Sequence, residues 1–175
     1  LTWPALLAKE LDYDYECYAK NGAGNLEILG TLLPHIKEDA DSAYIINWTW
    51  PERFSYKQDS KWKTLQPNTE SDLSRLYYKH FFSDECAHLN LLMCITLAHN
   101  MLVSKNIKFI MTYMDNDHIA DDLVYQYLTQ WDRNGFNFWC EANKLEKCPG
   151  KHWGVSAQKT AFEYIKNSGK INKLK

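Results

Sequence analysis

The sequence predicts an α/β fold, a three-layer α/β/α sandwich around a mostly parallel, flavodoxin-like sheet. Residues 43–48 form a compact, continuously apolar run, which is typical of a strand that is buried on both faces of a parallel sheet. Segments with strand character alternate along the chain with segments of helical periodicity. Neither a repeat nor a linker interrupts the 175 residues, so we expect a single domain over residues 1–175.

The first half of the chain predicts two helices and two strands. A helix over residues 2–11 begins with Thr2 and Pro4 and carries apolar residues at helical spacing. Residues 13–18 alternate apolar and polar side chains as a short strand does, and residues 21–25 form a tight turn before a second helix. The central strand over 43–48 follows, and the polar stretch 55–71 predicts a long loop.

The second half predicts a long helical region over 72–104, broken near residues 83–84, and a third strand over 107–113. A helix over 119–131, a loop over 133–151 and a last helix over 155–167 complete the chain. Three strands are few for a sheet covered on both faces, and a doubly wound sheet normally starts with its central strand. We therefore expect a further strand, either within a loop or upstream of Leu1.

Composition and charge narrow the classes of function. The net charge of −2 and the pI near 6.3 give no basic field for a phosphate backbone, which argues against nucleic-acid binding. We see no apolar run near the roughly 20 residues that span a bilayer and no signal-peptide pattern, so we expect no membrane association. Five cysteines without CxxC spacing favour a reducing compartment and free thiols, with pairing of Cys140 and Cys148 as the alternative.

In sheets of this kind the ligand site lies at the carboxyl ends of the strands. Four turns qualify on that ground: residues 21–25, 47–54, 113–118 and 150–154. Three of them carry the patterns AKNGAGN (19–25), NWTWPERF (47–54) and GKHWGVSAQK (150–159). Together these patterns resemble the second, third and fifth blocks of the SGNH (GDSL-like) hydrolase family, in a variant that we associate with phage-encoded and marine relatives.

The resemblance implies a serine ester hydrolase whose histidine activates a serine and whose oxyanion hole stabilises the tetrahedral intermediate. Its fifth block implies that His152 is the general base. The second and third blocks imply that Gly22 and Thr49 form the oxyanion hole, where Thr49 replaces the family's asparagine. The residues that we expect to bind substrate are Asn47, Trp50, Arg53 and Trp153.

Two parts of the family's machinery have no match in these residues. The first block, which supplies the nucleophilic serine, is absent, and the resemblance predicts that its strand and serine lie just upstream of Leu1. The family also carries an aspartate three residues before the histidine, where this chain has Pro149. The carboxylate that would orient His152 therefore stays open.

Each candidate residue also has a purely structural interpretation. His152 could cap the last helix, Gly22 could serve a turn that needs positive φ, and Arg53 could pair with Glu52 or Asp59. The acidic turn 115–118 contains ligand types for a divalent ion, but carboxylates also favour helix N-termini, and we expect no metal or cofactor there.

Three functions follow, in order of preference. The first is an SGNH-like ester hydrolase, cytoplasmic or virion-associated, acting on a small acyl or acetyl ester such as a glycan ester. The second is a catalytically inactive binding or virion-associated protein of the same fold. The third is a metal-dependent nucleotide-sugar transferase that uses Asp115 and Asp117. The oligomeric state stays open.

Overall fold

The computed structural model describes residues 1–36, 42–114, 126–129, 131, 135–149 and 152–175. It is a mixed α/β structure with two small sheets. In chain order the helices are α1 (Trp3–Glu10), α2 (Asn25–Leu32), α3 (Asp72–His80), α4 (Asp84–Ser104), α6 (Phe136–Ala142) and α7 (Val155–Asn167), with short 3-10 helices η1 (Leu33–His35) and η2 (Lys170–Leu174). The strands are β1 (Ala43–Trp48), β2 (Phe54–Gln58), β3 (Lys61–Leu65) and β4 (Lys108–Tyr113).

The centre of the fold is the parallel pair β1 and β4, in which Ala43 lies opposite Lys108 and Trp48 opposite Tyr113. Both strands agree with the sequence prediction to within a residue, and so does their parallel direction. A large parallel sheet does not form among the described residues, because this sheet has two strands. The predicted first strand over 13–18 is wrong: that segment is mostly exposed and has no strand partner among the described residues.

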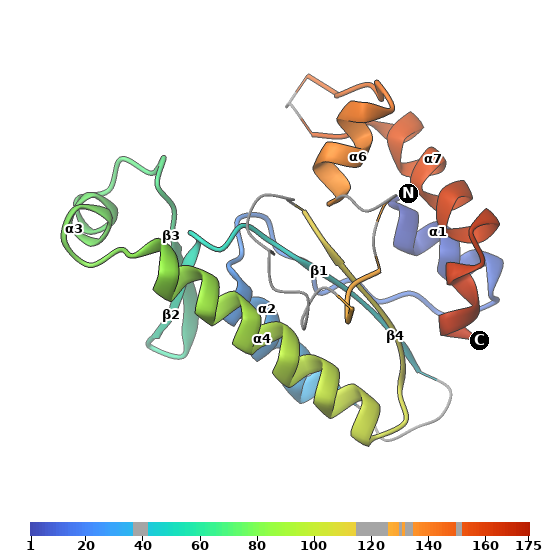
Figure 1. The fold of residues 1–175 in the computed structure, drawn as a ribbon, viewed down its shortest axis with the longest axis horizontal. Coiled ribbons are helices and arrows are strands. Elements are labelled where there is room, and N and C mark those ends of the chain that lie inside the picture. The colour runs from blue at the N-terminus through green and yellow to red at the C-terminus, as the bar shows by residue number, and fades with distance from the viewer. Residues whose placement is uncertain (37–41, 115–125, 130, 132–134, 150–151) are drawn as a thin grey trace.

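Helices pack on both faces of the β1–β4 pair, as Figure 1 shows. One core cluster joins α2 and α4 to side chains of one strand face, including Ile46, Trp48 and Met111. The other joins α1, α6 and α7 to the opposite face, where Ile110 is fully buried. The alternation of Ile110 and Met111 between the two clusters follows from the two-residue period of a strand.

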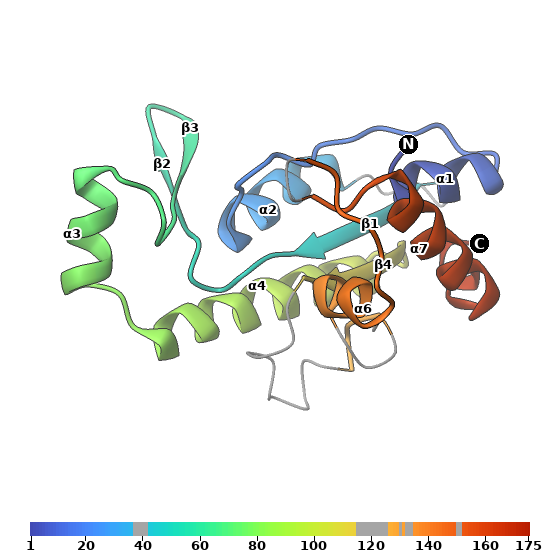
Figure 2. The same cartoon turned by 90° about the horizontal axis from the view of Figure 1, so that it is seen from above.

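The predicted loop over 55–71 contains a β-hairpin instead. Strands β2 and β3 pair antiparallel around Asp59 and Ser60, whose φ angles of 49° and 62° are those of a two-residue hairpin turn. The hairpin and α3 lie at the end of the molecule opposite α1 and α7 (Figure 2). The predicted break in the long helical region is confirmed, because Ser83 caps α4 by accepting a hydrogen bond from the Cys86 amide.

Helix α4 is long and apolar enough to cross a membrane by length and composition alone, with a mean hydropathy of 1.4, although we expected no such segment from the sequence. Leu91, Ile95 and Leu102 of this helix are fully buried in the core. The core helix of a soluble protein passes the same test.

The C-terminal part confirms the last predicted helix at the predicted bounds and corrects the loop before it, because α6 lies within residues 133–151. Residues 126–128 form a turn rather than the end of the predicted helix over 119–131, most of which lies outside the described residues. All five cysteines carry free thiols, so Cys140, which is buried, and Cys148, which is exposed, are not paired.

Candidate active site

Two of the predicted segments meet where β1 ends. Helix α2 begins at Asn25. The side-chain Nδ2 of Asn25 donates to the backbone oxygens of Thr49 (3.1 Å) and Trp50 (3.4 Å). In return the Thr49 amide donates to Asn25 Oδ1 at 2.9 Å. Both Asn25 and Thr49 are 5% exposed. The Asn25 side chain therefore fixes the start of α2 against the two residues that follow β1.

Arg53 completes this cluster from the next turn. Its Nη1 donates to Thr49 Oγ1 at 2.8 Å and to the Ala23 backbone oxygen at 3.4 Å. Its guanidinium lies over the Trp50 ring, 4.6 Å from the centroid. We call Gly22, Thr49, Trp50 and Arg53, four of the seven predicted site residues, the β1-end cluster.

The salt bridge considered for Arg53 does not form. Among the described residues Arg53 has no ion pair, with Glu52, Asp59 or any other acid. Burial lowers the pKa of Arg53, and the nearby charge of Glu52 partly offsets that effect. An arginine stays protonated at neutral pH despite such a shift, so the cluster carries a cation without a neutralising partner among these residues.

Gly22 adopts the left-handed conformation, with φ of 78°, so the turn requires a glycine there on structural grounds alone. Its backbone oxygen accepts a hydrogen bond from Gln66 Nε2 at 3.2 Å. Its amide donates to none of the described residues. The structural requirement and an available amide donor coexist at this residue.

A buried polar network behind the cluster was missed by the sequence analysis. Glu27, which is 4% exposed, pairs with Lys20 Nζ at 2.8 Å and accepts from Thr64 Oγ1 at 2.9 Å. Thr64 and Ser55 share a hydrogen bond of 2.8 Å, and Ser55 Oγ accepts from the Gly24 amide at 3.1 Å. These bonds tie the hairpin to α2, and they were hidden because both hydroxyl residues fall in the stretch predicted as a loop.

Asn47 lies on β1 opposite Thr112, and its Oδ1 accepts from Thr112 Oγ1 at 2.8 Å. The Asn47 side chain is exposed, whereas Thr112 is fully buried. Asn47 thus joins the two parallel strands through its side chain, one residue before β1 ends.

His152 and Trp153 lie in a separate loop between α6 and α7. His152 is exposed, its backbone oxygen accepts from the Cys148 amide at 2.8 Å, and its ring has no hydrogen bond to the described residues. Trp153 Nε1 donates to Asn137 Oδ1 at 3.0 Å, and the Lys147 ammonium lies 4.6 Å from the centre of the Trp153 ring.

The loop is linked through Trp153 to Asn137 of α6, and backbone hydrogen bonds connect α6 to the carboxyl ends of both strands. The Asn137 amide donates to the Met114 oxygen at 3.0 Å, and the Met114 amide donates to the Trp48 oxygen at 3.1 Å. The loop is thus tied to the edge of the sheet that carries the β1-end cluster. Within the described residues, however, no hydrogen bond or ring contact joins His152 or Trp153 to that cluster.

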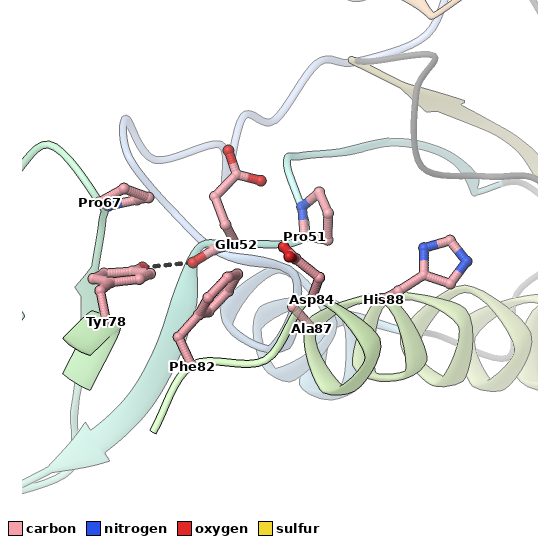
Figure 3. A pocket seen from close by; sticks show the side chains of 8 residues that line it. All are labelled: Pro51, Glu52, Pro67, Tyr78, Phe82, Asp84, Ala87 and His88. Carbon is pink, nitrogen blue, oxygen red and sulfur yellow. Dashed lines mark hydrogen bonds between the residues drawn. The ribbon is translucent and has the colours of Figure 1, made fainter. Parts of the chain in front are cut away.

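A pocket of about 300 Å³ lies between the turn after β1, the end of α3 and the start of α4 (Figure 3) and was not predicted. The Tyr78 hydroxyl donates to the backbone oxygens of Glu52 and Leu65, and burial raises the pKa of Tyr78 to about 12. Carboxylates of Glu52 and Asp84 and the ring of His88 supply its polar groups. The lining residues are Pro51, Glu52, Pro67, Tyr78, Phe82, Asp84, Ala87 and His88.

The acidic turn with Asp115, Asn116, Asp117 and His118, on which the transferase interpretation depends, lies outside the described residues. In the part of the chain that the structure describes, no group of histidine, cysteine, aspartate and glutamate side chains is arranged to hold a metal ion.

Fold and site together define a mixed α/β protein with a polar, cationic cluster at the carboxyl end of a parallel strand pair. No protein-family model matches the chain, and comparisons with curated proteins and with solved structures give no significant match.

Proposed function

We propose that the protein is an SGNH-type serine ester hydrolase that acts on a small acyl or acetyl ester. The proposal includes the finer fold, in which β1 and β4 belong to a larger, flavodoxin-like parallel sheet within a three-layer sandwich. Parallel pairing of β1 with β4 and helices on both of their faces support that arrangement. The four predicted residues of the β1-end cluster lie where such a fold places its chemistry.

The observation that carries the proposal is the state of the Thr49 hydroxyl. A hydroxyl can accept two hydrogen bonds and donate one. Arg53 Nη1 donates to Thr49 Oγ1, and no described residue accepts the Thr49 hydrogen. A cationic donor polarises the hydroxyl that it binds and so strengthens that hydroxyl as a donor. Thr49 therefore offers a polarised donor, and the free amide of Gly22 offers a second.

Such donors are what acyl transfer requires. When a serine attacks the ester carbonyl, His152 would take the serine proton while the carbonyl oxygen becomes an oxyanion bound by Thr49 and Gly22. The intermediate collapses as His152 returns the proton to the leaving alcohol. Water, deprotonated by the same histidine, then releases the acid. Among the described residues no serine hydroxyl contacts His152, so the proposal takes the nucleophile from the predicted first block.

The test uses the natural full-length protein with p-nitrophenyl acetate and a fluorophosphonate probe. We expect hydrolysis, labelling of one serine, and loss of both in His152→Ala. Thr49→Val removes the hydroxyl at nearly constant shape and should lower kcat about 10²- to 10³-fold, as for loss of one oxyanion donor. Thr49→Ser keeps the hydroxyl and should retain most of the activity. Thr160→Val is the matched control, because Thr160 is exposed on α7.

Equal activity of Thr49→Val and Thr160→Val would remove Thr49 from the oxyanion hole. If the protein is not labelled by the probe and does not hydrolyse the ester, the second candidate is favoured, a binding or virion-associated protein of the same fold. One observation supports that candidate: His152 has no carboxylate partner among the described residues. Activity that EDTA abolishes and manganese restores would favour the metal-dependent transferase.

A further inference from the structure

The guanidinium of Arg53 uses one side of its hydrogen-bonding capacity and leaves the other open. An arginine has five N–H donors, two on each Nη and one on Nε. Nη1 serves the Ala23 oxygen and Thr49 Oγ1, which accounts for both of its hydrogens. No described residue accepts from Nε or Nη2. These two atoms form the edge that binds a carboxylate through two parallel hydrogen bonds.

Arg53 also has no ion pair among the described residues, in contrast to Lys20 and Arg75. Lys20 pairs with Glu27 at 2.8 Å, and Arg75 pairs with Asp72 at 2.7 Å. Arg53 is only partly exposed and has no such partner among the described residues. A partly desolvated cation without an ion pair is costly to maintain. The nearby charge of Glu52 offsets part of that cost, and an anionic ligand would relieve more of it.

Trp50 and Thr49 hold the guanidinium in place. The Trp50 ring lies 4.6 Å from the guanidinium carbon, and the two bonds of Nη1 fix the orientation of the guanidinium plane. A fork that is held before the ligand arrives loses less side-chain entropy on binding. Because Thr49 is the proposed oxyanion donor, a group bound to Arg53 would lie next to the reacting ester.

We propose that the Nε–Nη2 edge of Arg53 binds a carboxylate of the substrate, beside the ester that is cleaved. The carboxylate lies against Arg53 and Trp50 and outside the adjacent pocket, because Glu52 and Asp84 in that pocket repel anions (Figure 3). The substrate class is thus an acidic ester. That the substrate is an ester rests on the proposed function, whereas recognition of a carboxylate by Arg53 does not depend on it.

Binding is tested first, without catalysis, on the full-length protein. Propionate and its neutral isostere propionamide are titrated while the arginine Nε–H resonances are followed by NMR. We expect propionate to shift the Arg53 resonance saturably and propionamide to leave it unchanged. Arg53→Lys identifies that resonance, and the exposed Arg75 is the internal control. An Arg53 resonance that propionate does not move, or moves only as much as that of Arg75, overturns the proposal.

Hydrolysis is then compared for 4-acetoxybenzoate and 4-acetoxybenzamide, which differ in the carboxylate. A charge-assisted, two-point contact should favour the acid about 10- to 100-fold in kcat/KM. Arg53→Lys should reduce that ratio to near one, whereas Arg75→Gln should keep it. Using the ratio cancels any effect of Arg53 on the oxyanion through Thr49.

The NMR titration and the comparison of ester hydrolysis distinguish failure of the carboxylate site from failure of the proposed hydrolase activity. Arg53-dependent binding of propionate without hydrolysis of either ester would sink the hydrolase and keep the carboxylate site. Hydrolysis of both esters at equal rates, with no shift of the Arg53 resonance, would keep the hydrolase and refute the carboxylate site.

Discussion

Replacement of Gly24 by alanine should destabilise the protein far more than the same change at Gly154. Both glycines are N-caps with extended backbones, at φ −95° before α2 and φ −72° before α7, so the capping cost of alanine is shared. A Cβ on Gly24 would lie 2.4 Å from Ser55 Oγ and 2.5 Å from the Arg53 backbone oxygen. The nearest atom to a Cβ on Gly154 is the Glu146 oxygen, at 3.3 Å.

The magnitude follows from two contributions at Gly24. Overpacking costs about 1–3 kcal/mol, and the Arg53 oxygen belongs to the backbone, so it cannot rotate away. Loss of the hydrogen bond from the Gly24 backbone amide to Ser55 Oγ adds about 1 kcal/mol. We expect Gly24→Ala to lose about 2–4 kcal/mol of unfolding free energy and Gly154→Ala less than about 1 kcal/mol.

Urea unfolding measures both variants. With a slope of about 2 kcal/mol/M, Gly24→Ala should unfold at a midpoint about 1–2 M lower than the natural sequence. Because the clash moves Arg53, the variant should also lose the proposed preference for acidic esters. Equal midpoints for Gly24→Ala and Gly154→Ala would show that α2 and the residues after β1 are not in the close contact described above.

Three further predictions test other parts of the structure. Asn25→Ala should cost about 2–4 kcal/mol in urea unfolding, because it leaves the buried Thr49 amide without its acceptor, whereas exposed Asn90→Ala should change stability by less than about 0.5 kcal/mol. Burial raises the pKa of Tyr78 to about 12. The contribution of Tyr78 to the free energy of unfolding is therefore complete below pH 10 and is lost as pH rises from about 10 to 12. This loss of stability should be absent from Tyr78→Phe. Thiol titration of the folded protein at pH 8 should show three fast cysteines, and two more only on unfolding, because burial raises the pKa of Cys94 to about 11 and of Cys140 to about 12. The three exposed cysteines are Cys17, Cys86 and Cys148.

The elements that could be predicted from the sequence are those whose pattern reports burial. The apolar run of β1 and the helical spacing of α7 record one environment along their whole length, and both have the predicted bounds. Residues 13–18 alternate in the same way as a strand, but a strand also needs a neighbour for its backbone groups. Alternation cannot supply that neighbour, and these residues run along the surface.

The hairpin was missed for a different reason. Its turn is Asp59-Ser60, both at positive φ, without the glycine that normally marks such turns. Its strands carry three exposed lysines, Lys57, Lys61 and Lys63, so their composition is that of a loop. The available signal was the pair Phe54 and Tyr56 at alternate positions. In the structure Trp62 lies opposite Lys57, whose ammonium lies over the Trp62 ring.

The site residues also fall into those that a local sequence pattern predicts and those that come into contact only through the fold. Thr49, Trp50 and Arg53 could be selected because they follow a recognisable strand in a short motif. Their partners could not, since Asn25 reaches Thr49 across 24 positions and Ser55 reaches Gly24 across 31. Sequence spacing contains no record of such pairs unless both members belong to a known motif.

This division explains why Arg53 became more informative once its surroundings were known. From the sequence, an arginine beside Glu52 is as consistent with a surface salt bridge as with a ligand contact. The structure assigns its Nη1 to Thr49 and Ala23, leaves Glu52 unpaired with it, and stacks the guanidinium on Trp50. An ion pair with Glu52 would have neutralised the cation and competed for its free edge. The arrangement instead keeps the charge and the two-point edge available beside the Thr49 hydroxyl, and the proposed acidic ester would use both.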